Sequence, residues 1–243
     1  MWQDVRTQLH PRGVEIVTVG MDTAGPEACR QFIEAADPQH PSLVDVGHLM
    51  AERFGVVNIP NGIWIDEDGM VVRPAEPAWP PGMPARPRAD SDAPIPEHMQ
   101  EIFAEASKIS VDREAYGRAL LDWVEHGAAS RFVLSPDEVV ARSTRRDLPS
   151  AEAAAHFGLA QHLWRAGRSD AAIPHFRKAH RLQPENFSYK RQAWSLATPD
   201  AGPFERFWQG PFEGHEAEWP YEGDWLTEVR KMGAENYYPP MET

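Results

Sequence analysis

The sequence contains only one cysteine, Cys29, among its 243 residues. One cysteine excludes an internal disulfide framework and a zinc site built from thiolates. No run of 18 apolar residues is present, so we expect no transmembrane helix. The first residues also lack the basic-then-apolar pattern of a secretory signal peptide. From these absences we expect a soluble, cytoplasmic protein.

Positive charge is scarce as well. The chain carries 24 lysines and arginines against 37 aspartates and glutamates, a formal net charge of −13. Because that balance repels phosphate backbones and anionic lipids, we expect neither nucleic acid nor a membrane surface as a partner. The glycine-rich motifs that cradle nucleotide phosphates and the Gly-x-Ser-x-Gly motif of serine hydrolases are missing too. The sequence therefore implies no cofactor.

The ten histidines do not form a recognisable metal motif. His156 and His162 are six positions apart, and His175 and His180 are five apart. Neither spacing gives the i, i+4 pair of a zinc-binding helix, and there is no His-Glu-x-x-His. We expect structural or surface roles for these side chains and no metal site.

Residues 1–75 alternate between helix and strand patterns, which predicts an α/β domain. The segment Asp66–Gly69 combines turn residues between two apolar runs and predicts a tight hairpin. The predicted helices are Met1–His10, Pro26–Ala36 and Val46–Phe54, and the predicted strands are Val14–Gly20, Pro41–Asp45, Gly62–Asp66 and Met70–Arg73.

The rest of the chain falls into three segments of different composition. Residues 76–96 are rich in proline and predict a linker. Residues 97–200 read as an all-α region, with one helix over Arg113–His126 and another whose capping box is Ser135 and Glu138. Residues 201–243 are aromatic and acidic and predict a tail that packs its rings onto the body.

Residues 153–186 resemble one tetratricopeptide repeat. Small residues in this 34-residue pattern let two antiparallel helices approach closely, and Gly167 would make the turn between them. Phe187–Ala197 would be the helix that follows. The matching positions are Leu159, Ala160, Gly167, Ala172, Phe176, Ala179 and Pro184. The resemblance implies a protein partner bound at this helical region.

Residues 13–74 resemble the thioredoxin-like thiol–disulfide oxidoreductases of the TlpA/ResA group. The resemblance rests on Gly13–Asp22, Val44–Asp45, Phe54–Val56, Ile59–Pro60, Ile65–Asp66 and Gly69. It implies a thioredoxin-like fold in which Pro60 is cis. It also implies that Ile59, Pro60 and Asn61 shape the groove for a protein or peptide disulfide.

The reacting atoms of that family are missing from this sequence. In the family a strand and a Cys-x-x-Cys helix start precede the segment that Val14–Gly20 resembles, and the helix N-terminus lowers the pKa of the attacking thiol. The missing strand is central in the fold, so its loss would leave two open strand edges. We therefore expect the downstream part of a longer protein. A misassigned start, a degenerate paralogue and a selenocysteine codon read as a stop are three alternatives.

Cys29 is the one candidate thiol that remains. It lies in the first turns of the helix predicted over Pro26–Ala36, beside Arg30, where the helix dipole could favour a thiolate. The same position also suits an incidental, half-buried residue. A peroxidase based on Cys29 would need a threonine-x-x-cysteine context that this sequence lacks.

Two functions follow from these expectations. In the first, the protein is a thioredoxin-like redox protein that exchanges disulfides in its full-length form, while this chain is inactive because it lacks the nucleophile. In the second, it is a non-enzymatic adaptor that uses the helical repeat region to hold a protein partner.

Overall fold

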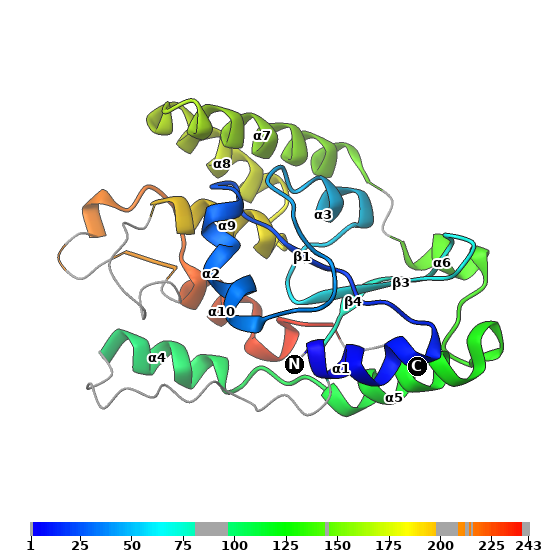
Figure 1. Cartoon of the computed structure of the whole chain (residues 1–243). Helices are drawn as coiled ribbons and strands as arrows, with labels where there is room; N and C mark the ends of the chain where they lie inside the picture. Colours follow the sequence, from blue (N-terminus) through cyan, green and yellow to red (C-terminus); the bar gives the residue numbers. More distant parts are fainter. Residues whose placement is uncertain are drawn as a thin grey trace. The chain divides into compact units, whose positions relative to one another are not determined.

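The computed structural model describes residues 2–80, 97–143, 146–197, 209–211, 214 and 216–239. Within these ranges the chain is mixed α/β, with many helices and two small sheets (Figure 1). It divides into two compact units. The first comprises Met1–Met83, Asp112–Asp147 and Pro240–Thr243, and the second comprises Pro84–Val111 and Leu148–Pro239. No helix in the described ranges combines the length and apolar character needed to cross a membrane.

The first unit opens with a helix and a parallel strand pair. Helix α1 (Trp2–Leu9) runs into a short 3₁₀ turn that closes at Gly13, whose φ of 88° suits glycine. Strand β1 (Thr18–Gly20) is shorter than the predicted strand and pairs in parallel with β2 (Ser42–Val44). Helix α2 (Pro26–Ala36) connects them and has the predicted bounds.

An antiparallel hairpin follows helix α3 (Leu49–Phe54). Strand β3 (Asn61–Ile65) pairs with β4 (Val71–Pro77). The predicted turn forms because Asp66 Oδ1 accepts the amides of Asp68 and Met70, at 3.1 and 2.8 Å. Strand β4 continues to Pro77, so the first two residues of the predicted linker belong to this strand.

The core of the first unit joins α1, the hairpin and a helix that is distant in sequence. Helix α5 (Arg113–His126) has the predicted bounds, and α6 (Pro136–Arg142) begins at Ser135 with the predicted capping box. The contact-based division places both helices with the strands, whereas the sequence boundaries grouped them with the all-α region. The buried members of this core are Val5, Leu9, Trp64, Val72, Ala78, Tyr116, Ala119, Leu120 and Phe132.

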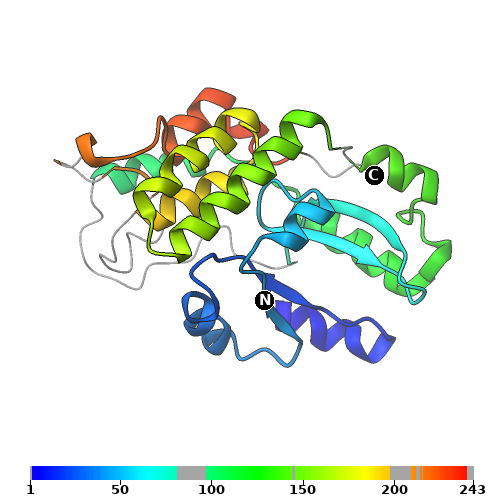
Figure 2. The same ribbon diagram turned by 90° about the horizontal axis from the view of Figure 1, so that it is seen from above.

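The second unit is helical in the described residues. It contains α4 (Glu97–Ala106), α7 (Leu148–Arg165), α8 (Ser169–Leu182), α9 (Phe187–Ala197) and α10 (Trp225–Met232). Helices α7 and α8 form a hairpin whose turn is at Gly167, where φ is 72°. The small buried residues of α7 and α8 allow the two helices to lie close together. Helix α9 begins at Phe187, as predicted. Figure 2 shows these three helices from above.

Part of the predicted organisation lies outside the described residues. Most of the proline-rich segment (81–96), the end of the helical region (198–200) and much of the aromatic tail (201–208, 212, 213, 215 and 240–243) belong to this part. Within the described tail, Asp224 caps α10 by accepting the amide of Thr227 at 2.8 Å. The tail therefore contains a regular helix, and its Trp225 and Val229 are buried.

Candidate functional site

The predicted groove residues form the loop that enters β3. The Ile59–Pro60 peptide bond is cis. Asn58 Oδ1 accepts the Ile59 amide at 2.9 Å, and the Pro60 carbonyl accepts the Ala78 amide. The Ile59 side chain is 38% exposed, whereas the Oδ1 atom of Asn61 is buried without a hydrogen-bond partner among the described residues. The loop thus presents one partly exposed apolar side chain, while the buried Asn61 oxygen is out of reach of a ligand in this conformation.

Two strand edges beside this loop are open. The amide of Thr18 donates to Pro41 and the carbonyl of Gly20 accepts from Asp45, so the backbone groups of Val17 and Val19 point away from β2. No hydrogen bond between described residues uses them. The views of Figures 1 and 2 place β1 next to the β3–β4 hairpin, yet the two pairs are separate sheets.

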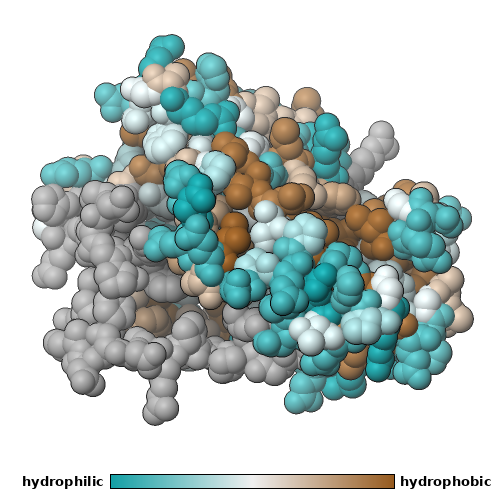
Figure 3. Space-filling view, in the orientation of Figure 1, coloured by the Kyte–Doolittle hydropathy of each residue, from teal (hydrophilic) through white to brown (hydrophobic). Residues whose placement is uncertain are grey.

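The outer edge of β3 is open in the same way. The Pro60 carbonyl accepts the Ala78 amide and the Asp66 amide donates to the Met70 carbonyl, so the peptide groups of Ile63 and Ile65 point to the other side. Val17 and Ile65 are exposed by 51% and 46%. Figure 3 shows that hydrophobic residues lie at this face of the molecule among polar ones. An open edge next to exposed β-branched side chains is a site for adding a strand.

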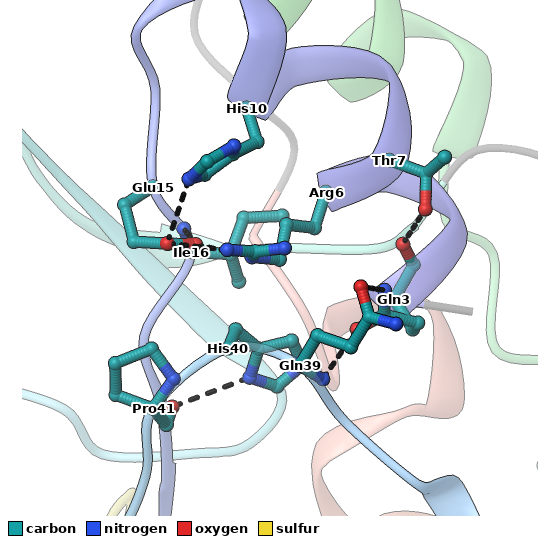
Figure 4. A network of polar contacts seen from close by, with 9 residues as sticks. All are labelled: Gln3, Arg6, Thr7, His10, Glu15, Ile16, Gln39, His40 and Pro41. Atoms are coloured by element: carbon teal, nitrogen blue, oxygen red, sulfur yellow. Dashed lines mark hydrogen bonds and ion pairs between the residues drawn. The ribbon is translucent and has the colours of Figure 1, made fainter.

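A polar network fixes α1 against the start of the β1 segment (Figure 4). Arg6 donates two hydrogen bonds to the Glu15 carboxylate, at 2.7 and 2.9 Å, and this contact lowers the pKa of Glu15 to about 2. Glu15 also accepts the Ile16 amide, and Gln3 Oε1 accepts the Gln39 amide at 2.8 Å. The Arg6–Glu15 contact fixes the second half of α1 to the segment before β1, and the Gln3–Gln39 contact fixes its first half to the segment before β2.

Cys29 lies in α2, where the helix crosses β1 closely. A Cβ on Gly20 would lie 3.1 Å from the Cys29 sulfur, so the glycine makes room for the thiol. Burial, with Asp22 nearby, raises the pKa of Cys29. Arg30 is engaged by Glu27 at 2.6 Å and Glu34 at 3.6 Å. The surroundings therefore favour the neutral thiol over a nucleophilic thiolate.

Sequence reasoning missed a buried histidine beside β2. Asp45, just after β2, accepts the amides of Leu49 and Met50 at 2.9 and 2.7 Å and anchors the start of α3. His48 occupies the intervening turn with φ 55° and is only 2% exposed. Burial lowers the pKa of His48 to about 4, although the nearby charge of Asp45 acts to raise it. A positive φ at a non-glycine residue cannot be read from the sequence pattern.

The structure brings together two histidines that the sequence separates. His156 of α7 and His175 of α8 stack with ring centroids 5.0 Å apart, and their Nδ1 atoms are 2.8 Å apart. In this hydrogen bond one Nδ1 atom must donate and the other must accept. No cluster of three or more histidine, cysteine or acidic side chains suited to a metal is present in the part of the chain that the structure describes.

Comparison of the chain with protein-family models, with curated proteins and with solved structures found no match. A functional proposal for the first unit therefore rests on the geometry of the open strand edges and of the Pro60 loop.

Proposed function

We propose that the first unit contains a thioredoxin-like module that takes part in thiol–disulfide exchange when a nucleophile-bearing strand and helix start complete it. Ile59, Pro60 and Asn61 form the groove for the disulfide substrate in this proposal. Cys29 is not the attacking thiol, because its surroundings disfavour a thiolate. The chain by itself is inactive in this chemistry.

The observation that carries the proposal is the pair of open edges on β1 and β3. Val14 and Ile16, which lead into β1, pack against the same core as Trp64 of β3. The segment before β1 and the β3–β4 hairpin thus pack against one core that includes residues of α1 and α5, although the two strand pairs form separate sheets. One strand, parallel to β1 and antiparallel to β3, would satisfy both edges and cover Val17 and Ile65.

The order of the elements along the chain also supports a thioredoxin-like module. Helix α1, the parallel pair, α3, the Pro60 loop and the hairpin follow one another as the equivalent elements do in the TlpA/ResA group. In that group the Cys-x-x-Cys pair starts the helix that α1 resembles. A thiol at that helix start would have its pKa lowered by the dipole.

An insulin-disulfide reduction assay with dithiothreitol tests the proposal. We would fuse an apolar strand and a Trp-Cys-x-x-Cys helix start directly before Trp2, with a Ser-x-x-Ser fusion as the matched control. We expect turnover only from the cysteine fusion, together with a higher melting temperature for both fusions, because both close the edges. Turnover by the unmodified chain, or none from a folded cysteine fusion, would refute the proposal. Cys29→Ser in the active fusion should leave turnover unchanged.

A second candidate function is a non-enzymatic adaptor that binds a protein partner through α7–α9. The observation that favours it is the tight helical hairpin: Phe157 of α7 contacts Phe176 of α8 with centroids 5.6 Å apart and stacks on Tyr189 of α9 at 4.0 Å. Leu159 is 42% exposed on α7. A partner bound in this way should be lost with Leu159→Arg and kept with Pro60→Ala, and the reverse result would exclude this role.

A further inference from the structure

The second unit contains a cavity that neither function uses. Helices α8, α9 and α10 and the segment before α10 enclose a volume of about 240 Å³. This is below the range of sites for drug-sized ligands, so the cavity suits a small molecule. Its charged lining consists of Arg177, Arg181, Lys190, Lys231, Glu222 and Glu228.

The charge of this lining is opposite to that of the chain. Four cationic side chains face two carboxylates, so two positive charges are in excess, whereas the whole chain has a formal charge of −13. Cations collected at one concave site of an acidic protein raise the local concentration of anions.

The two carboxylates are already neutralised by neighbouring cations. Lys190, which is only 3% exposed, donates to Glu228 at 2.6 Å. Arg181 donates to Glu222 at 2.9 Å. These two ion pairs involve both carboxylates of the lining. The other two cations, Arg177 and Lys231, therefore have no acidic partner within the lining.

The excess charge therefore belongs to Arg177 and Lys231. Arg177 donates its Nε hydrogen to the neutral carbonyl of Pro220, which leaves the guanidinium charge uncompensated. Lys231 is exposed and makes no ion pair with any residue that the structure describes. A guanidinium and an ammonium with free donors are the usual ligands of a tetrahedral oxyanion.

The cavity wall also offers two neutral aromatic rings, those of His180 and Trp194. His180 Nε2 is buried and has no hydrogen-bond partner among the described residues. Burial and the charge of Lys190 lower the pKa of His180 to about 3, so the ring is neutral at pH 7 and adds no charge to the lining. Trp194 forms a further wall, with its ring centroid 6.2 Å from that of His180.

We propose that this cavity binds a small phosphate monoester. Such a group carries about −1.5 to −2 charges at pH 7, which matches the excess of two positive charges. Arg177 and Lys231 bind its oxygens, and Trp194 contacts the organic group. The site lies on helices of the second unit and does not depend on the open strand edges, so it goes beyond the proposed redox function.

Isothermal titration of the full chain with phenyl phosphate, inorganic phosphate and benzyl alcohol tests the proposal. We expect one saturable site for phenyl phosphate, weaker binding of inorganic phosphate and none of benzyl alcohol. Arg177→Gln and Lys231→Gln should each weaken binding by about tenfold, because each removes a charged hydrogen-bond donor. Both side chains are exposed, so these variants should keep the fold.

Arg168→Gln is the matched control, because this exposed arginine precedes α8 outside the cavity lining. It should bind phenyl phosphate like the unmodified chain. The proposal is overturned if the unmodified chain shows no saturable binding of phenyl phosphate. It is equally overturned if the Arg177→Gln, Lys231→Gln double variant binds as tightly as the control. An inactive cysteine fusion in the insulin assay would leave this result unaffected.

Discussion

Trp64 of β3 donates its indole hydrogen to the hydroxyl of Tyr116 on α5 at 3.1 Å, across 52 positions of sequence. Both residues are buried, at 3% and 4% exposure, and Trp64 also stacks on Trp123 with centroids 4.9 Å apart. The hydrogen bond joins the hairpin to the helix that covers it. This contact explains why α5 belongs to the first unit.

Tyr116→Phe should destabilise the protein by about 1–3 kcal/mol, because it leaves the buried Trp64 indole without its acceptor. Chemical denaturation followed by tryptophan fluorescence would measure the loss. A double-mutant cycle with Trp64→Phe should show coupling between the two positions. Additive effects of the two substitutions would contradict the interpretation.

Gly62→Ala should destabilise by about 1–3 kcal/mol through overpacking. A Cβ at this position would lie 2.6 Å from the Tyr116 hydroxyl and 2.8 Å from the Ala78 Cβ. Because the hydroxyl is one of the two clashing groups, the penalty should be smaller in a Tyr116→Phe background. An equal penalty in both backgrounds would show that Ala78 alone causes the strain.

Glu76→Gln should cost about 3 kcal/mol, because it leaves the Arg73 guanidinium buried without its counter-charge. Arg73 is 2% exposed, donates to Glu76 at 2.7 Å through two nitrogens and donates to the Phe132 carbonyl at 2.9 Å. The control is Glu114→Gln, whose partner Arg118 is exposed and 3.5 Å away. This control should change stability by less than about 1 kcal/mol, and comparable losses for both variants would refute the prediction.

Stability should fall as the pH drops from about 6.5 to 4. The unfolded chain protonates His48 at the ordinary pKa of 6.5, whereas the folded chain keeps it neutral down to a pKa of about 4. The unfolded state therefore binds more protons in this window, which costs about 2 kcal/mol by pH 5. His48→Asn suits the positive φ and should flatten the profile. If the stability of the His48→Asn variant fell with pH as steeply as that of the unmodified protein, the role of His48 would be contradicted.

Cys29 should react with iodoacetamide more slowly than glutathione does at pH 7.5. Burial raises the pKa of this thiol, so little thiolate is present at neutral pH. The rate should rise steadily as the pH is increased above 8. A rate above that of glutathione would restore Cys29 as a candidate nucleophile.

Local elements could be predicted because their signals are short in range. Pro26 at a helix start, the Ser135–Glu138 capping box and the Asp66 turn act through neighbouring residues, and the corresponding elements form where the sequence predicts them. The predicted helix over Val46–Phe54 begins later, at Leu49, because Asp45 and the positive φ of His48 form a turn first. Asp45 and Gly47 are turn-forming residue types, so the sequence carries a weak local signal for this turn.

The candidate site was predictable only in part. The Ile59–Asn61 loop follows from the resemblance of residues 13–74, and the buried Oδ1 of Asn61 does not, because burial depends on the residues packed around it. The raised pKa of Cys29 depends in the same way on its place beside Gly20 and Asp22. The phosphate cavity draws on three helices and the segment before the third, and no motif links their residues.

The sequence by itself determined most of the helices and turns outside the tail, because periodicity, caps and composition are local properties of the chain. It did not reveal α10. Only the tertiary structure decided that α5 joins the strands, that β1 and β3 keep open edges and that His156 meets His175. These are contacts between positions far apart in sequence. They form because apolar surface must be buried jointly and because backbone groups bond wherever the fold places a partner.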